Sequence, residues 1–282
     1  MSNSYDNSML SQYQKCPMSF YLQYIKQLRK KVDDDGAKEF GSAFHKFAEN
    51  RLKGCKEPLV YQEPTDMPVY SRKALDLFCE AYASKYPDKE IELLECEAVN
   101  EFELGNQTFK VKCDAVIGLQ GNIYGLELKT TKSISFNYFQ KYFLNSQISA
   151  QTYSIKKKYG QCSGILLRAG ETKCLQRKPS ADYDSVFNTD AGYLCCKFTS
   201  DYINRNSDEL ADWAENTLLW IDTINESIEH NLFPKSTGSW GGAICSNCEY
   251  KELCKVSKGT LLDEEIKDLF YKEVDAFSYL NN

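Results

Sequence analysis

The chain has 282 residues, 42% of them hydrophobic, so it is long enough to bury a sizeable core in one large domain or two small ones. Its formal net charge of −6 argues against a general nucleic-acid coat, although a local basic channel is compatible with it. No run of about 18 apolar residues is present, and the polar first residues do not resemble a signal peptide, so we expect a cytoplasmic protein without a membrane span. The 12 cysteines are too sparse for a secreted disulfide scaffold, which agrees with a reducing compartment.

Hydrophobic periodicity predicts helices first, then strands, then helices again. Helical spacing covers residues 8–27, 39–52 and 69–85. From residue 91 the period changes, and short alternating runs predict an antiparallel meander over residues 93–99, 101–104, 108–117 and 123–130. The following elements are a helix over 146–159, strands over 164–168 and 193–198, a long helix over 201–229 and an amphipathic helix over 260–277.

This order predicts an α/β fold in which a central mixed sheet is flanked by helices. No internal repeat, low-complexity tract or Pro-rich linker divides the chain, so we expect a single domain over residues 1–282. Within it we distinguish N-terminal helices over residues 1–55, a sheet core over 91–200 and a C-terminal cysteine cluster over 232–255.

Two carboxylates and one lysine are predicted to share a face of the sheet. Glu127 and Lys129 are two residues apart in a strand, so their side chains project from the same face. A turn at Gln120-Gly121 would set Asp114 opposite Glu127, and a turn at Gly121-Asn122 would set it opposite Lys129.

Charged groups are rare on apolar, internal strands unless they are paired or bind metal. Hard oxygen ligands suit Mg²⁺ or Mn²⁺, and a neighbouring lysine could orient a water or neutralise a phosphate oxygen. An exposed salt cluster is the alternative interpretation.

Residues 40–48 place His45 on an inward helical face with small neighbours such as Gly41 and Ala48. The imidazole is therefore either a hydrogen-bonded core residue or part of the same site.

Four cysteines have the pattern of a metal centre. Cys245, Cys248 and Cys254 follow a C-x2-C-x5-C spacing that lets three thiolates reach one centre, and Cys16, from the other end of the chain, would complete the set. Four thiolates bind either an iron–sulfur cluster or a structural zinc ion.

The motifs occur in a specific order, with Gly41-x3-His45 first, Asp114 next and Glu127-x-Lys129-Thr130 last. This pattern resembles the RecB-type branch of the PD-(D/E)XK nuclease superfamily. The segment around Cys16, together with the late cysteines, is similar to the iron–sulfur members of that branch. These include the CRISPR-associated exonucleases, their phage relatives and the nuclease subunits of recombination helicase complexes.

The resemblance implies a role for each matching residue. His45, Asp114, Glu127 and the backbone carbonyl of Leu128 would hold Mn²⁺ or Mg²⁺, and Lys129 would position the attacking water. The four cysteines would hold a [4Fe–4S] cluster. The family also has a glutamine and a tyrosine four residues apart on the next helix. Here the chain departs from that pattern, because Gln147 is followed by Gln151 and Tyr153 comes two residues later, so the supporting role of Tyr153 is open.

The sequence therefore leads to three hypotheses, one of which is a zinc-stabilised DNA-binding protein. The first is a metal-dependent DNA exonuclease that acts on single-stranded ends in recombination, repair, phage replication or CRISPR adaptation. No G-x4-G-K-[ST] motif is present, so any ATP-driven unwinding would come from a helicase partner. The alternative is a cluster-bearing DNA-binding or adaptor protein of a CRISPR or replication complex, with little nuclease activity. Homo-oligomerisation is compatible with all three.

Overall fold

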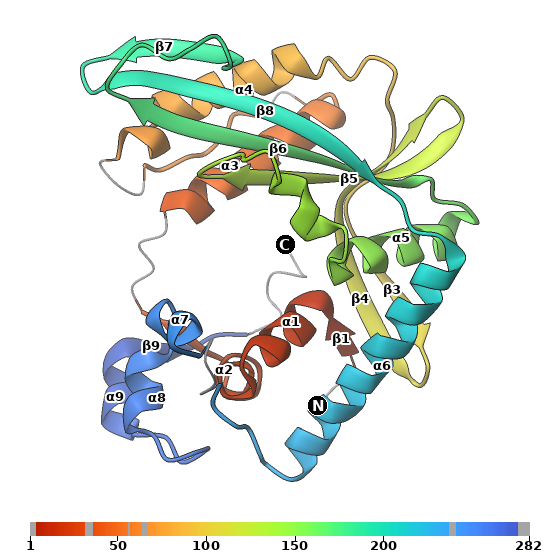
Figure 1. Cartoon of the computed structure of the whole chain (residues 1–282), viewed down its shortest axis with the longest axis vertical. Coiled ribbons are helices and arrows are strands. Elements are labelled where there is room, and N and C mark those ends of the chain that lie inside the picture. The colour runs from red at the N-terminus through yellow and green to blue at the C-terminus, as the bar shows by residue number, and fades with distance from the viewer. Residues whose placement is uncertain (1–3, 32–35, 56, 64–66, 237–240, 276–282) are drawn as a thin grey trace. The chain divides into compact units, whose positions relative to one another are not determined.

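The computed structural model describes residues 4–31, 36–55, 57–63, 67–236 and 241–275 (Figure 1). The chain divides into two compact units. The first unit consists of residues 1–33, 101–111 and 208–282, and the second of residues 34–100 and 112–207. Whether they form the single domain expected from the sequence stays a prediction.

The central sheet contains parallel and antiparallel neighbours, which confirms the mixed α/β fold. β5 (Asn122–Thr131) is parallel to β6 (Gly164–Leu175) and antiparallel to β4 (Gln107–Leu119). β8 (Gly192–Ile203) runs beside β6 along their length and also pairs with the short strand β7 (Ser185–Thr189), both in antiparallel fashion (Figure 1). β3 (Glu92–Leu104) pairs with β4. Residues 101–111, which join β3 to β4, belong to the first unit.

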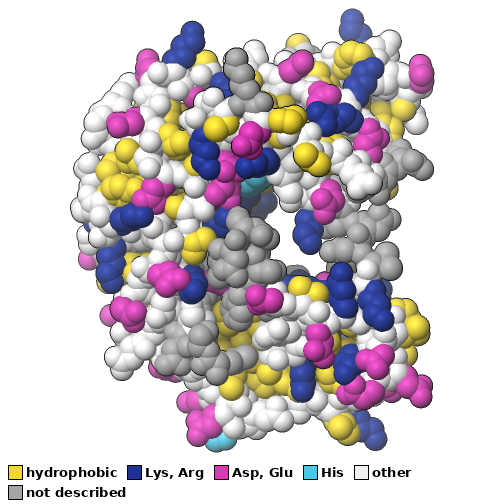
Figure 2. Space-filling view, turned by 180° about the vertical axis from the view of Figure 1, so that it is seen from behind, with side chains coloured by type: hydrophobic (Ala, Val, Ile, Leu, Met, Phe, Trp, Pro, Cys, Tyr) yellow, Lys and Arg dark blue, Asp and Glu magenta, His cyan; other side chains and the backbone are white. Residues whose placement is uncertain are grey.

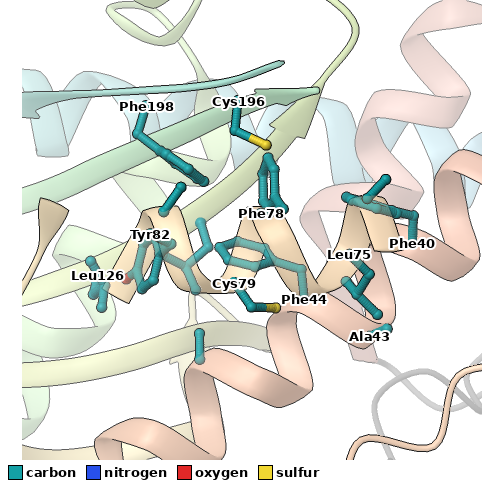
Figure 3. Packing of buried hydrophobic residues seen from close by; sticks show 14 of the residues in the cluster. Phe40, Ala43, Phe44, Leu75, Phe78, Cys79, Tyr82, Leu126, Cys196 and Phe198 are labelled. Carbon is teal, nitrogen blue, oxygen red and sulfur yellow. The ribbon is translucent and has the colours of Figure 1, made fainter. Parts of the chain in front are cut away.

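Helices of the second unit pack on both faces of this sheet. These helices are α3 (Gly36–Leu52), the short 3₁₀ helices η2 (Pro68–Tyr70) and η3 (Tyr138–Tyr142), α4 (Arg72–Lys85) and α5 (Ser146–Tyr159). α3 and α4 cover the face from which Leu126 and Leu128 project (Figure 3). α5 packs on the opposite face, where a Cβ added to Gly125 would lie 3.0 Å from Ile155 Cδ1.

The bounds of α5 match the sequence prediction because both ends carry local signals. The Asn145 side chain caps the helix by accepting a hydrogen bond from the Gln147 N–H at 2.8 Å. Gly160 ends it with a φ of +76°, which glycine adopts without strain.

The β4–β5 hairpin has the first of the two registers that the sequence left open. Leu119 pairs with Asn122 and Ala115 with Leu126, so Gln120 and Gly121 form the turn. Both have positive φ, +51° and +80°, as a type I′ hairpin turn requires.

The first unit contains helices and short strands from both ends of the chain. β1 (Ser4–Asp6) pairs in parallel with residues 108–110 of β4, and β2 (Leu28–Lys30) pairs with β9 (Tyr271–Glu273) in antiparallel fashion. The helices are α1 (Asn7–Lys15), α2 (Pro17–Phe20), the π-helix η1 (Tyr21–Ile25), α6 (Ser207–Glu229), α7 (Gly241–Ser246), α8 (Lys251–Val256) and α9 (Glu264–Phe270). None of the helices in the described ranges is both long and apolar enough to cross a bilayer.

Several predicted element bounds were wrong. The helix expected over residues 8–27 is interrupted at Cys16, whose extended backbone (φ −165°, ψ 109°) separates α1 from α2. The helix expected from residue 201 begins at Ser207, because β8 continues to Ile203. The helix expected over 260–277 is only the seven residues of α9, followed by β9, and residues 276 and 277 lie outside the described ranges.

Phe78 of α4 is at the centre of the apolar cluster between the sheet and helices α3 and α4. Its side chain is fully buried, and its ring centroid lies 4.8 Å from that of Phe44 and 4.5 Å from that of Phe198. These edge-on and tilted contacts, with their burial, connect α3, α4 and β8 (Figure 3).

We therefore expect Phe78→Ala to lower the free energy of unfolding by about 3–5 kcal/mol, because it removes a buried ring and leaves a cavity. Denaturant unfolding measures this change. Val60→Ala is the matched control, since Val60 is 95% exposed and its truncation should change stability by less than about 0.5 kcal/mol. A loss below about 1 kcal/mol for Phe78→Ala would contradict this packing.

Candidate active site

Strand β5 carries an ionised pair on one face and core residues on the other, as its alternation predicted. Leu126 and Leu128 are 1% and 2% exposed and pack against α3 and α4. Glu127 is also buried, at 3% exposure, although it bears a carboxylate. A carboxylate at this depth requires hydrogen bonds and a counter-charge, so the surroundings of Glu127 determine how the site is built.

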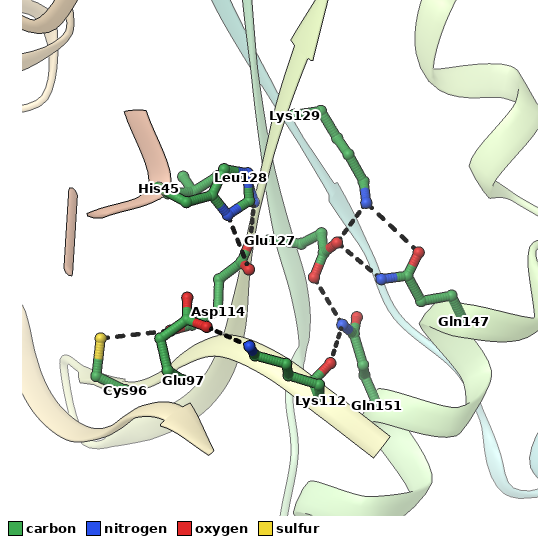
Figure 4. Close-up of polar contacts among 10 residues, drawn as sticks. All are labelled: His45, Cys96, Glu97, Lys112, Asp114, Glu127, Leu128, Lys129, Gln147 and Gln151. Atoms are coloured by element: carbon green, nitrogen blue, oxygen red, sulfur yellow. Dashed lines mark hydrogen bonds and ion pairs between the residues drawn. The ribbon is translucent and has the colours of Figure 1, made fainter. Parts of the chain in front are cut away.

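The Glu127 carboxylate receives these partners from β5 and α5 (Figure 4). Lys129 Nζ lies 2.5 Å from Glu127 Oε1, and Gln147 Nε2 donates to the same oxygen at 2.8 Å. Gln151 Nε2 donates to Oε2 at 2.6 Å and to the carbonyl oxygen of Lys112 at 3.1 Å. The two glutamines are one helical turn apart, so both reach one carboxylate.

Asp114 joins the same site from β4. The β4–β5 ladder ends at the Ala115–Leu126 pair, and Asp114 and Glu127 are the next residues of the two strands beyond it. Its Oδ2 accepts a hydrogen bond from the Leu128 N–H at 2.7 Å, and its Oδ1 lies 3.2 Å from His45 Nδ1. The structure thus places His45 of α3 beside Asp114.

Glu97 of β3 also points into this site, which the sequence analysis did not foresee. One ligand atom each from His45, Glu97 and Asp114 lies within 4.8 Å of the other two, whereas Glu127 is not part of that group. The Glu97 carboxylate also lies 2.8 Å from Lys112 Nζ. Its backbone φ is +53°, which is unusual for a non-glycine residue inside a strand and marks a local change of direction.

The sequence contains only a weak signal for Glu97. Glu95 and Glu97 are two residues apart in a strand, like Glu127 and Lys129, but nothing in their spacing shows which of them meets Asp114. In the structure Glu95 instead pairs with Lys158 and Tyr159 of α5.

Charges within the site shift its pKa values in opposite directions. Burial alone would raise the pKa of Asp114, but His45 and the Leu128 N–H outweigh it and lower that pKa. Burial and the neighbouring Asp114 charge raise the pKa of Glu127, although the Lys129 ammonium acts to lower it. Two close carboxylates with a histidine and a lysine therefore form one coupled group.

The two cationic groups hold their protons more tightly than usual. Burial would lower the pKa of His45, but the Asp114, Glu127 and Glu97 carboxylates raise it overall. Burial would likewise lower the pKa of Lys129, but the Glu127 and Asp114 carboxylates raise it overall. In the space-filling view, one histidine side chain lies recessed among acidic and basic side chains (Figure 2).

This donor set suits a hard divalent cation. Carboxylate oxygens, a backbone carbonyl and one imidazole are ligands that Mg²⁺ and Mn²⁺ accept, and a bound cation would offset the repulsion between the acids. Tyr153 also lies on α5, with Lys157 Nζ 6.0 Å from its ring centroid. Its supporting role stays a prediction.

The four predicted cysteine ligands come together in the first unit. Cys16, Cys245, Cys248 and Cys254 are all free thiols that line one cavity of about 620 Å³. Burial would raise the pKa of Cys16, but hydrogen bonds from Ser236 and Ser19 outweigh it and lower that pKa. Cys16, at the break between α1 and α2, thus lines the cavity with a thiol whose pKa is lowered.

Comparison with known proteins assigns the family. The model of the PD-(D/E)XK nuclease superfamily matches residues 7–255. The chain belongs to this superfamily. Membership supports a nuclease activity on DNA and the use of divalent metal ions, for which the His45, Glu97 and Asp114 group offers ligands.

Two solved structures are similar to this superfamily member at low sequence identity. The structure titled SSO0001 has a TM-score of 0.39 and 15% identity, with 90% of this chain and 86% of that chain covered. A "Putative exonuclease" from Eubacterium rectale has a TM-score of 0.48 and 9% identity, with 94% and 91% covered. No curated protein sequence matches the chain. The family assignment rests on the family match alone.

The contact between His45 and Asp114 predicts a measurable titration. The chain has only 2 histidines, so their imidazole NMR signals can be followed separately in metal-free protein. We expect the pKa of His45 to lie above 6.5 in the wild type and to fall in Asp114→Asn, because the neutral amide removes the carboxylate's attraction for the imidazolium. His230 is the internal control. An unchanged pKa of His45 in Asp114→Asn would contradict the contact.

Proposed function

We propose that the protein is a metal-dependent DNA exonuclease that hydrolyses phosphodiester bonds at single-stranded ends. The observation that carries this proposal is the buried Glu127 carboxylate, which Lys129, Gln147 and Gln151 hold beside Asp114. A buried acidic pair with a lysine is costly for stability alone, whereas it matches the needs of phosphoryl transfer.

In this proposal each side chain has a separate task. His45, Asp114, Glu127 and the Leu128 carbonyl would hold Mg²⁺ or Mn²⁺, and Glu97 would add a ligand from β3. A bound divalent ion supplies Lewis-acid stabilisation of the phosphate and lowers the pKa of a water ligand. Lys129 orients the attacking water and offsets charge at the phosphate. Gln147 and Gln151 keep the Glu127 carboxylate in one orientation by donating hydrogen bonds to it.

We also propose that the four cysteines hold a [4Fe–4S] cluster. Zinc bonds of about 2.3 Å would bring tetrahedral sulfur ligands to about 3.8 Å from one another. Among the residues with described side chains, the only group of three or more metal-ligating residues within 4.8 Å is that of His45, Glu97 and Asp114, so no three of the thiols lie that close. A shared cavity with more widely spaced thiols favours a larger inorganic group over a single ion.

The nuclease proposal is tested with end-labelled single-stranded DNA and Mn²⁺ or Mg²⁺. We expect Lys129→Ala and Asp114→Ala to lower the rate at least about 100-fold, since each removes charge stabilisation that acts in the transition state. Lys178→Ala, which removes an exposed lysine outside the site, should cleave like the wild type. Wild-type rates in both site variants would rule out this mechanism.

The cluster proposal is tested by metal content, colour and unfolding. Anaerobically purified wild type should be brown and contain iron, whereas Cys16→Ala should lose the iron and unfold at a lower temperature, because metal binding is coupled to folding. Cys55→Ala is the control, since Cys55 is exposed and does not line the cavity. Colourless wild type with stoichiometric zinc, or an iron-retaining Cys16→Ala, would refute the cluster assignment.

A further inference from the structure

The segment between β5 and α5, residues 132–145, has an unusual composition. It contains no aspartate or glutamate in a chain whose net charge is −6, and it carries Lys132 and Lys141. Five of its residues are aromatic: Phe136, Tyr138, Phe139, Tyr142 and Phe143. Cationic and aromatic side chains without acids are the combination that contacts unpaired nucleic acid.

Chain continuity places both ends of this segment at the candidate active site (Figure 1). It begins three residues after Lys129, and it ends at Asn145, two residues before Gln147. Lys129 and Gln147, which flank the segment, both donate hydrogen bonds to the Glu127 carboxylate. A DNA strand that reaches this carboxylate therefore also approaches residues 132–145.

The segment is held by hydrogen bonds from the rest of the second unit. The buried Glu171 carboxylate of β6 accepts a hydrogen bond from the Ile134 N–H. The Arg205 guanidinium donates to the carbonyl oxygens of Tyr142, at 3.2 Å, and Phe143. Because these bonds fix the backbone, the exposed side chains are presented in a defined arrangement.

The segment contains both buried tyrosines and fully exposed apolar side chains. Tyr138 and Tyr142 are buried, and Lys141 Nζ lies 4.0 Å and 5.0 Å from their ring centroids. In contrast, Phe136 is 103% exposed and Leu144 is 98% exposed. At this exposure the two faces of the Phe136 ring are accessible to a ligand.

We propose that residues 132–145 form a stacking platform for the bases of single-stranded DNA, with Phe136 as the stacking ring and Lys132 and Lys141 facing the phosphates. This inference rests on the proposed nuclease function and adds how the site distinguishes unpaired from paired strands. Bases in a duplex already stack on one another, whereas an unpaired base gains by stacking on Phe136.

The test measures binding of a fluorescent oligothymidylate by anisotropy in EDTA, so that no hydrolysis occurs. We expect Phe136→Ala to weaken binding about 5- to 100-fold, the range for loss of one base–aromatic stack. Phe136→Trp should restore affinity, because it keeps an aromatic face, whereas Phe136→Leu should stay weak. Phe187→Ala is the control, since Phe187 is a partly exposed aromatic residue on β7. Thermal unfolding checks that all variants are folded.

The lysines give a second readout. Lys132→Gln should reduce the slope of log K against log salt concentration by about 0.7, the contribution of one phosphate contact on a single strand. Affinity for a blunt duplex should change little in Phe136→Ala.

Three outcomes would overturn the platform. They are a wild type that does not bind the oligonucleotide, a Phe136→Ala variant that binds as tightly as the wild type, and a Phe136→Leu variant with wild-type affinity, which would indicate a general apolar contact. Failure of the nuclease proposal has a different signature, because a wild type that binds through Phe136 but leaves DNA intact with Mn²⁺ contradicts hydrolysis and not stacking.

Discussion

The buried carboxylate of Glu127 sets the main constraint on the second unit. A charge at 3% exposure is tolerated only if its oxygens are fully engaged, and here β5 supplies Lys129 while α5 supplies Gln147 and Gln151. Strand and helix must therefore keep one relative position. Gln151 Oε1 is nevertheless buried and finds no hydrogen-bond partner among the described residues, so this arrangement is not the one that stability alone would favour.

The hairpin turn brings the second acid to Glu127. Positive φ at both Gln120 and Gly121 selects a two-residue turn, and the register that follows ends at Ala115–Leu126, directly before Asp114 and Glu127. A slip of one residue would move Asp114 to the other face, among the leucines that pack on α3 and α4. The geometry of the site thus depends on the hairpin turn. This turn is distant from the carboxylates, but it fixes the register in which their two strands pair.

The sequence predicted those parts of the site that follow a regular period. The shared face of Glu127 and Lys129 and the bounds of α5 follow from strand alternation and from capping residues. Glu97 was missed because its position depends on a left-handed backbone conformation that no periodicity encodes. The break at Cys16 was missed for a related reason, since the apolar residues of α1 and α2 stay at helical spacing on both sides of it.

The departure of α5 from the family pattern has a physical explanation in Gln151. The resembled family has a tyrosine four residues after its glutamine, and a tyrosine hydroxyl donates one hydrogen bond. The Gln151 amide donates two, one to Glu127 Oε2 and one to the carbonyl oxygen of Lys112. It therefore connects the Glu127 carboxylate of β5 to the backbone of β4 two residues before Asp114. A side chain that fixes both acidic strands at once can replace the tyrosine without loosening the site.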